Sequence, residues 1–159
     1  MNKRALVRKI IAHLDAELEG YAKSARSAHA DATDPQNKAE NKYDTRGLEA
    51  SYLAHGQSRQ AMETAQARQQ FQELELREFG PGEGIDLSAL VELEGDGERT
   101  IYFIGPSAGG AEILHEKKTV IVITHQSPLG RQLMGRKAGE RLPIAMGGTR
   151  REYHIVAVE

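Results

Sequence analysis

The residues with the clearest chemical potential lie in one polar stretch, "ADATDPQNKAENKYDTRG". Asp34 and Pro35 make a good helix start, because Asp accepts hydrogen bonds from free amide groups and proline has no N–H to lose. From that start, four polar side chains share one helical face at i, i+3, i+4 and i+7, namely Asn37, Glu40, Asn41 and Asp44. Carboxylates flanked by amides can help to hold Mg2+, which takes one or two protein carboxylates and fills its shell with water and phosphates. The stretch predicts half of a metal site completed by a partner, or a polar turn with local lysine pairs, and composition alone favours the turn.

Long helical sequence lies on both sides of this stretch. Before it, apolar residues recur at alternating spacings of four and three: Val7, Ile11, Leu14, Leu18, Tyr21, Ala25 and Ala28. This heptad seam predicts a helix over 2–31, about 45 Å long at the usual rise per residue. A second helix is expected up to Glu78, with a less regular seam of Ala50, Leu53, Ala54, Ala61, Ala65, Phe71 and Leu74. We expect an antiparallel coiled-coil hairpin over 1–79 with an acidic tip at 31–44.

The period changes after "GPGEG" at 80–84, which is a strong helix stop and a predicted domain boundary. Alternating apolar residues then predict strands in "IDLSALVELEG", "RTIYFIG", "KTVIVIT", "RREYHIVAVE" and, more weakly, "LPIAMGG". One short helix is expected in "SPLGRQLMGRKAGE", with Ser127 as N-cap and Pro128 in its first turn. Residues 85–159 should therefore form a small antiparallel sheet packed on one short helix, and the chain as a whole belongs to the α+β class.

Composition excludes several functions. The chain has 159 residues, a formal net charge of -2 and no cysteine, so it is no general polyanion binder and has no disulfide framework or thiolate metal site. The basic start is neither a signal peptide nor a membrane span, and a cytoplasmic protein with no membrane partner is expected. The histidines lack zinc-site spacing, and "GPSAGG" lacks the lysine of a phosphate-binding loop.

Arg136, Lys137 and Arg141 form a small basic cluster, suited to docking or to a solvated helix end.

Three stretches resemble the GreA/GreB family of bacterial transcription elongation factors. "ITHQSPLGRQLMGRKAGERLPI" resembles the family's SP-x-x-x-A-L-x-G-K-x-x-G-D-x-V stretch, with matches at Ser127, Pro128, Leu133, Gly135, Lys137 and Gly139. "YFIGP" resembles the strand and turn before the family's central loop, and "NKAEN" resembles the tip motif D-L-K-E-N. "KYDTRG" also resembles a stretch of short Gre-like proteins.

The resemblance implies a coiled-coil hairpin and a C-terminal FKBP-like domain that docks on the rim of the RNA polymerase secondary channel. Ser127, Pro128, Arg136 and Lys137 are the candidate docking residues. The tip acids, Asp34, Glu40 and Asp44 with the amides of Asn37 and Asn41, would then share Mg2+ with the polymerase near the RNA 3′ end. The chain would bind no metal stably alone and would not itself be an enzyme. A monomer without sequence-specific DNA binding is expected.

The tip departs from the family pattern at one position. Asn37 stands where the motif has an aspartate, and an amide is a neutral and weaker metal ligand than a carboxylate. Relatives with altered tips occupy the same channel without stimulating cleavage and inhibit the polymerase, so stimulation of transcript cleavage and non-cleaving modulation both stay open. Two other hypotheses are a peptidyl-prolyl isomerase or chaperone, for which Tyr102, Phe103 and Tyr153 offer few aromatic walls, and a coiled-coil dimerisation module.

Overall fold

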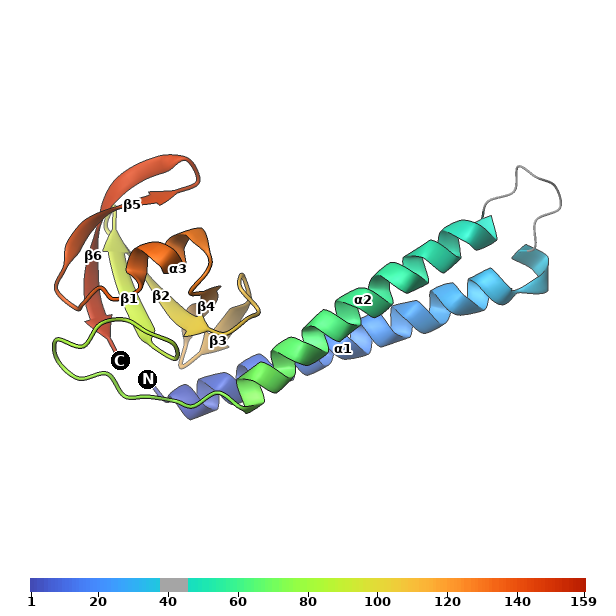
Figure 1. Cartoon of the computed structure of the whole chain (residues 1–159), viewed down its shortest axis with the longest axis horizontal. Coiled ribbons are helices and arrows are strands. Elements are labelled where there is room, and N and C mark those ends of the chain that lie inside the picture. Colours follow the sequence, from blue (N-terminus) through green and yellow to red (C-terminus); the bar gives the residue numbers. More distant parts are fainter. Residues whose placement is uncertain (38–45) are drawn as a thin grey trace. The chain divides into compact units, whose positions relative to one another are not determined.

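A computed structural model describes residues 1–37 and 46–159 (Figure 1). Its elements are α1 (Lys3–Thr33), the 3-10 helix η1 (Pro35–Asn37), α2 (Arg46–Gln72), β1 (Leu90–Gly95), β2 (Glu98–Gly105), β3 (Glu112–His115), β4 (Lys118–Thr124), α3 (Pro128–Leu133), β5 (Arg141–Met146) and β6 (Thr149–Val158). They form two compact units. The helical unit comprises 12–68, and the sheet unit comprises 1–11 together with 69–159. The expected α+β class is confirmed.

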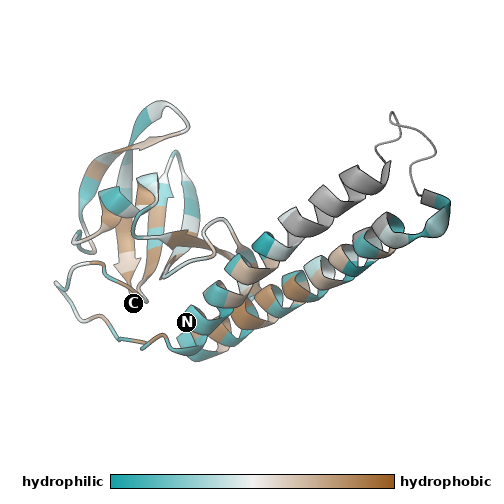
Figure 2. Cartoon of the chain, turned by 45° about the vertical axis from the view of Figure 1, so that its right-hand side comes forward, coloured by the Kyte–Doolittle hydropathy of each residue, from teal (hydrophilic) through white to brown (hydrophobic). Residues whose placement is uncertain are grey.

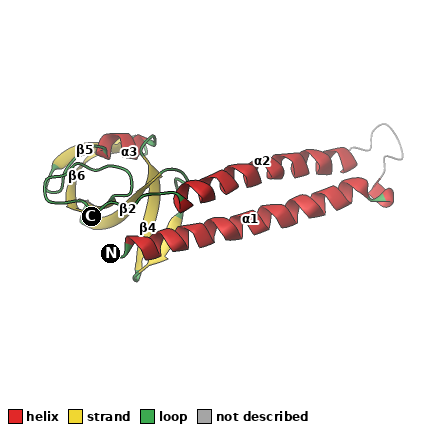
Figure 3. Cartoon of the chain, turned by 60° about the horizontal axis from the view of Figure 1, so that its bottom comes forward, coloured by secondary structure: helices red, strands yellow, loops and turns green. Residues whose placement is uncertain are grey.

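In the helical unit, α1 and α2 lie side by side and run antiparallel (Figure 3). The predicted seam of α1 is the less exposed side: Leu14 is buried and Leu18 and Tyr21 are half-buried. Arg68 Nε donates to Asp15 Oδ1 over 2.5 Å and so joins the two helices. The spacing of apolar residues along α1 therefore identified the face that turns toward α2.

The second helix ends earlier than expected and shows a different seam. Ala65 is exposed whereas Ala67 is buried, so the predicted seam was wrong at this position. The helix stops at Gln72 rather than at Glu78, because the stretch "LELREF" that follows alternates apolar and charged residues with a period of two. This irregular segment is held by a hydrogen bond from Arg77 N to Ser88 Oγ at 3.0 Å.

The sheet has six strands in the order β3-β4-β2-β1-β6-β5. All five predicted strand stretches contribute one strand each, although β1 begins at Leu90 rather than at Ile85. The expectation of a purely antiparallel sheet is wrong, since β2 and β4 pair in parallel. The reason is β3, which was not predicted: it runs back at the edge of the sheet, and the turn at Glu116 and Lys117 then inserts β4 between β3 and β2.

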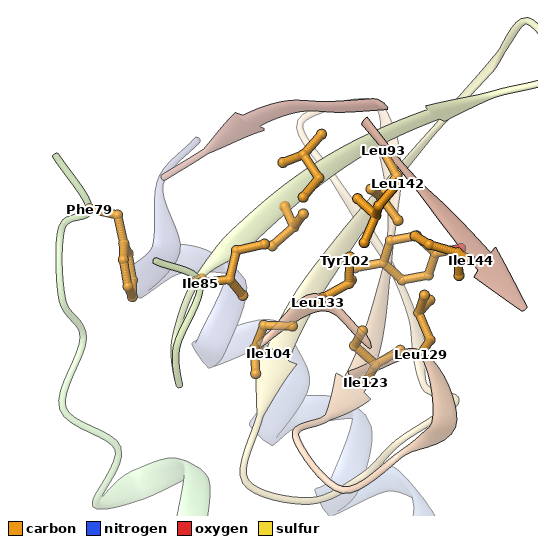
Figure 4. Packing of buried hydrophobic residues seen from close by; sticks show 13 residues of the cluster. Phe79, Ile85, Leu93, Tyr102, Ile104, Ile123, Leu129, Leu133, Leu142 and Ile144 are labelled. Atoms are coloured by element: carbon orange, nitrogen blue, oxygen red, sulfur yellow. The ribbon is translucent and has the colours of Figure 1, made fainter. Parts of the chain in front are cut away.

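One face of the sheet carries the main hydrophobic core (Figure 4). Leu129 and Leu133 of α3 pack there against residues from β1, β2, β4, β5 and β6. The remaining core members are Phe79, Ile85, Ala89, Val91, Leu93, Tyr102, Ile104, Ile123, Leu142, Ile144 and Ile155. In Figure 2 many residues of these strands are coloured brown, that is, hydrophobic. The short helix thus sits on the sheet, as its apolar positions predicted.

The strand β6 changes its alternation part-way. Ile155 is fully buried, but the register between β1 and β6 shifts between Glu92 and Leu93. Beyond this irregularity Val158 packs against the same core as Ile155, although the two are three residues apart and a regular strand would place them on opposite faces. A β-bulge adds a residue to one strand and so moves the following side chains to the other face.

The ends of the two long helices belong to the sheet unit. Phe71, in the last turn of α2, stacks with Phe103 of β2 at a ring-centroid distance of 6.4 Å. A Cβ on Gly105 would lie 2.9 Å from the Phe71 ring, so the glycine leaves room for it. Leu6 and Ile10 of α1 are completely buried, and Lys9 Nζ donates to Leu114 O of β3 over 2.8 Å. The strands β2 and β4 are consequently buried on both faces, which explains their continuous apolar runs.

The Phe71 side chain should carry a large share of the sheet unit's stability. Phe71 is 1% exposed, and truncation to alanine would leave a cavity beside Phe103 and Gly105. We expect Phe71→Ala to lower the free energy of unfolding by about 3–5 kcal/mol in urea denaturation. Met62→Ala on the same helix is the control, because Met62 is 67% exposed, and it should change stability by less than about 0.5 kcal/mol. Equal losses in both variants would contradict the packing role of Phe71.

The start of α1 is tied to the β3–β4 turn by Glu116. Asn2 N donates to Glu116 Oε1 over 3.0 Å, and this bond lowers the pKa of the carboxyl from its usual 4.5. Because the folded-state pKa is depressed, the stabilisation is present above the unfolded-state pKa and is lost as the pH falls through the folded-state pKa. We expect wild type to be more stable than Glu116→Gln at neutral pH and the difference to shrink in acid, as measured by denaturation between pH 7 and pH 3. A constant difference across that range would exclude this linkage.

Candidate functional site

The Ser-Pro motif builds the start of α3. Ser127 is the N-cap, and its Oγ accepts a hydrogen bond from Gly130 N at 3.0 Å and donates one to Thr124 O at 2.8 Å. Pro128 occupies the first turn, where its missing N–H costs nothing, and is exposed. The hydroxyl of Ser127 is thus used inside the fold, while the Pro128 ring is available to a partner.

Gly130 permits this tight helix start. A Cβ at this position would lie 1.9 Å from Thr124 O, so any side chain would force β4 and α3 apart. The same backbone region therefore depends on two small groups, the Ser127 hydroxyl and the bare Cα of Gly130. Ser127 and Gly130 set the backbone geometry at the start of α3, and their polar groups are used within the fold.

The loop after α3 presents the predicted basic residues. Arg136 and Lys137 are exposed, and Glu140 is their nearby acid: Arg136 Nη1 lies 3.5 Å from Glu140 Oε2, and Lys137 N donates to Glu140 Oε1 over 2.9 Å. The Lys137 ammonium group has no acidic partner within ion-pair distance in the described part of the chain. Arg131 of α3 is also exposed and was not predicted, although its place in "SPLGR" made it visible in the sequence.

Backbone hydrogen bonds fix this loop from both sides. Ile85 N donates to Arg136 O at 2.7 Å and Gly135 N donates to Ile85 O at 2.8 Å. Further along, Gly139 N donates to Ile155 O at 2.7 Å, and Ile155 N donates back to Glu140 O at 2.9 Å. Gly135 and Gly139 adopt φ of 76° and 89°, which favours glycine. Arg136 and Lys137 are therefore carried by a rigid loop, and the glycines of the motif are explained by its turns.

Gln132 of α3 ties the helix to the edge strand β5. Its Nε2 donates to Ala145 O at 3.1 Å, and its Oε1 accepts from Ala145 N at 2.9 Å. The side-chain amide thereby satisfies the outward-facing backbone groups of Ala145. Pro143 in the same strand has no N–H to offer. Together they protect the β5 edge from pairing with another strand.

At the other predicted site, the structure describes the residues up to Asn37. Asp34 Oδ1 accepts from Gln36 N at 2.8 Å and so caps η1. Glu40, Asn41 and Asp44 lie outside the described residues, as does the side chain of Asn37. In the described ranges no group of three or more metal-binding side chains is positioned to hold an ion. Sharing of Mg2+ with a partner therefore stays a prediction.

The sheet unit contains one buried cation that the sequence did not reveal. Lys3 is 4% exposed, its Nζ donates to Arg77 O, and it lies 4.8 Å from the centroid of the Phe79 ring. Burial lowers the pKa of Lys3, while Glu78 and Glu159 oppose this shift. Lys3 looks like an ordinary charged residue at a helix start in the sequence, because its burial depends on the distant segment 77–79.

Two of the three aromatic residues considered for an isomerase pocket come together. Tyr102 and Tyr153 line a hollow of about 370 Å³ with Leu93 and Met146, whereas Phe103 is buried against Phe71. Burial raises the pKa of Tyr102, and Tyr153 adds to the shift. The rim of the hollow is polar, with Asp96, Glu98, Thr100 and Arg151, and Arg151 pairs with Asp96. This polar lining differs from the apolar walls that hold a proline ring.

The chain combines two long helices with an α+β unit, and that unit carries the Ser-Pro helix start and the basic loop. The resemblance to GreA/GreB factors implies a helical hairpin and a C-terminal domain with these docking residues. Comparison with curated proteins points the same way. Over 84 residues the chain is 36% identical to "Transcription inhibitor protein Gfh1" of Thermus thermophilus, covering 51% of this chain and 51% of the relative. The Gfh1 of a second strain is 34% identical over the same length. No protein-family model matches the chain.

Solved structures of similar proteins carry related names. Gfh1 of Thermus aquaticus superposes with a TM-score of 0.41 at 24% identity, over 95% of this chain and 92% of that one. The Gfh1 of Thermus thermophilus, described as "GreA factor homolog 1", gives a TM-score of 0.39 at 24% identity over 94% of both chains. Because these TM-scores are low, the superpositions establish no residue-by-residue correspondence. The sequence similarity to proteins named Gfh1 covers about half of this chain, and the chain spans about half the length of the curated relatives it matches.

No helix in the described residues is long and apolar enough to cross a membrane.

The cap of α3 gives a direct test of the site's architecture. Ser127→Ala removes both the acceptor for Gly130 N and the donor to Thr124 O, so we expect the free energy of unfolding to fall by about 1 kcal/mol. Ser127→Thr keeps the hydroxyl and should recover most of this loss. Chemical denaturation measures both variants. If the threonine variant is as unstable as the alanine variant, the hydroxyl is not the stabilising group.

Proposed function

We propose that the chain is a Gre-like transcription factor that binds RNA polymerase at its secondary channel and modulates transcription. The observation that carries this proposal is the 36% identity over 84 residues to a protein named "Transcription inhibitor protein Gfh1". The Ser-Pro motif supports it, since Ser127 and Gly130 shape a helix start that presents Pro128 and the neighbouring basic loop. The polymerase would supply any chemistry, and the chain would act as a factor rather than as an enzyme.

The docking surface consists of Pro128, Arg131, Arg136 and Lys137. Its charge is positive apart from Glu140, which engages Arg136 and the Lys137 backbone. A rigid, exposed cationic surface of this kind suits an acidic patch on the rim of the polymerase channel, because complementary charge steers association. Ser127 supports this surface through its capping bonds.

The residues of the tip favour inhibition over cleavage. Asn37 replaces the acid expected from the family motif, and a neutral amide binds Mg2+ more weakly than a carboxylate. The curated relatives are also named as inhibitors. A factor that occupies the channel and does not complete a metal site would inhibit the polymerase by obstruction. Stimulation of cleavage is the second candidate, and the presence of Glu40 and Asp44 in the sequence favours it.

Binding to the polymerase tests the docking surface. We expect Arg136→Ala combined with Lys137→Ala to weaken binding to core RNA polymerase about tenfold, since two exposed ion pairs of up to ~1 kcal/mol each are lost. The control combines Lys117→Ala with Lys118→Ala, which removes the same charge from the exposed β3–β4 turn. Competition against a labelled secondary-channel ligand measures both. Failure of wild type to compete would refute the proposed partner, and equal weakening in both double variants would refute the surface.

Transcript cleavage on a stalled, backtracked complex separates the two candidate activities. We expect wild type to inhibit elongation and to leave the backtracked RNA intact, while binding is retained. Efficient cleavage by wild type that is lost in Glu40→Ala and Asp44→Ala would establish the second candidate instead. The same two variants should then still compete for the channel, because the docking surface is unchanged.

A further inference from the structure

The sheet unit contains a second surface groove, which shares no residue with the docking surface. It has a volume of about 530 Å³ and is lined by the last turn of α2, the irregular segment that follows it, the loop before β1 and the residue after β2. Leu74, Leu87 and Pro106 contribute its apolar part. Its polar lining comes from Gln70, Glu73, Glu75, Arg77 and Asp86. Apolar and charged side chains therefore line the same groove, a combination that suits recognition of a short protein segment.

The charged residues that line this groove are predominantly negative. Three carboxylates face one guanidinium group, and that group is already engaged, since Arg77 Nη1 lies 3.0 Å from Asp86 Oδ2. Glu73 accepts a hydrogen bond from the neutral Gln69 side chain at 2.9 Å. Within the described ranges neither Glu73 nor Glu75 has a cationic partner at ion-pair distance. The groove therefore offers two uncompensated carboxylates beside apolar surface.

The walls of the groove are held in place by bonds that do not involve these two carboxylates. Arg77 N donates to Ser88 Oγ, and the Arg77 guanidinium lies 5.0 Å from the Phe79 ring centroid. Leu87 N donates to Asp86 Oδ1 at 2.8 Å. Ser88 itself is fully buried. A partner would thus meet a preformed groove and would lose little free energy in ordering it.

We propose that this groove, bounded by Leu74, Leu87 and Pro106, binds a basic extended segment of a partner protein. Arginine or lysine side chains of that segment pair with Glu73 and Glu75, and an apolar side chain between them contacts the three apolar residues. Charge complementarity selects this occupant, because the carboxylates that line the groove repel acidic segments and nucleic acid phosphates. The surface lies outside the proposed polymerase docking surface, so it gives the chain a second, independent protein contact.

A short peptide of alternating arginine and leucine is the probe. We expect it to bind the full chain in fluorescence anisotropy and to shift the backbone amide signals of Leu74 and Leu87 in NMR spectra. Glu73→Gln combined with Glu75→Gln should weaken binding roughly fivefold to tenfold, as expected for two exposed ion pairs. The matched control is Glu98→Gln combined with Glu112→Gln, which removes the same charge from two exposed carboxylates outside the groove and should leave affinity unchanged.

Two further peptides separate the contributions of charge and shape. A peptide with glutamate in place of arginine should not bind, and one with serine in place of leucine should bind more weakly than the original. The proposal is overturned if the control double variant loses as much affinity as the groove variant, since binding would then follow net charge alone. It is equally overturned if the amides of Leu74 and Leu87 do not respond. Neither result depends on whether the chain binds RNA polymerase.

Discussion

The burial of β2 and β4 on both faces is the constraint on which the sheet unit depends. The main core covers one face, and the other is closed by apolar residues at the ends of the two long helices, Phe71 above all. A strand pair that is apolar on both sides cannot remain exposed on either. The helix ends therefore cannot be separated from the sheet without uncovering Phe103. For this reason the compact unit includes residues 1–11 and 69–159 rather than the C-terminal part alone.

This constraint also explains where sequence patterns succeeded. Patterns that depend on local geometry were informative: the heptad spacing of α1, the strand stretches, and the Ser-Pro start of α3. The hairpin turns are equally local. Asp96 and Gly97 both adopt positive φ, as do Gly147 and Gly148, and Asp-Gly and Gly-Gly are dipeptides that tight hairpin turns favour. Each of these features needs only a few neighbouring residues to form.

The misses involve partners that are distant in the sequence. The position of the irregular segment after α2 depends on Ser88, which accepts from Arg77 N, and burial of Lys3 depends on Arg77 and Phe79. The parallel pairing of β2 with β4 depends on β3, a strand of four residues whose alternation is too short to detect. Likewise, the role of Gln132 appears only when β5 is in place, because a glutamine on a short helix carries no signal that it will bond to a strand.

The candidate docking residues divide into those that shape the surface and those that face a partner. Ser127 forms its hydrogen bonds within the fold, and Gly130, Gly135 and Gly139 permit its close approach and turns. Pro128, Arg136 and Lys137 are exposed. At the tip, Asp34 is likewise used inside the fold, because its Oδ1 accepts from Gln36 N and so caps η1. A spare carboxylate that is partly engaged in a cap can replace a missing metal ligand only at some cost to that turn. With Asn37 neutral, the remaining charge for a shared cation therefore falls mainly on Glu40 and Asp44. Because Mg2+ requires near-ideal octahedral geometry, two acids in a different order from the family motif are a weaker basis for a shared metal site than the motif itself.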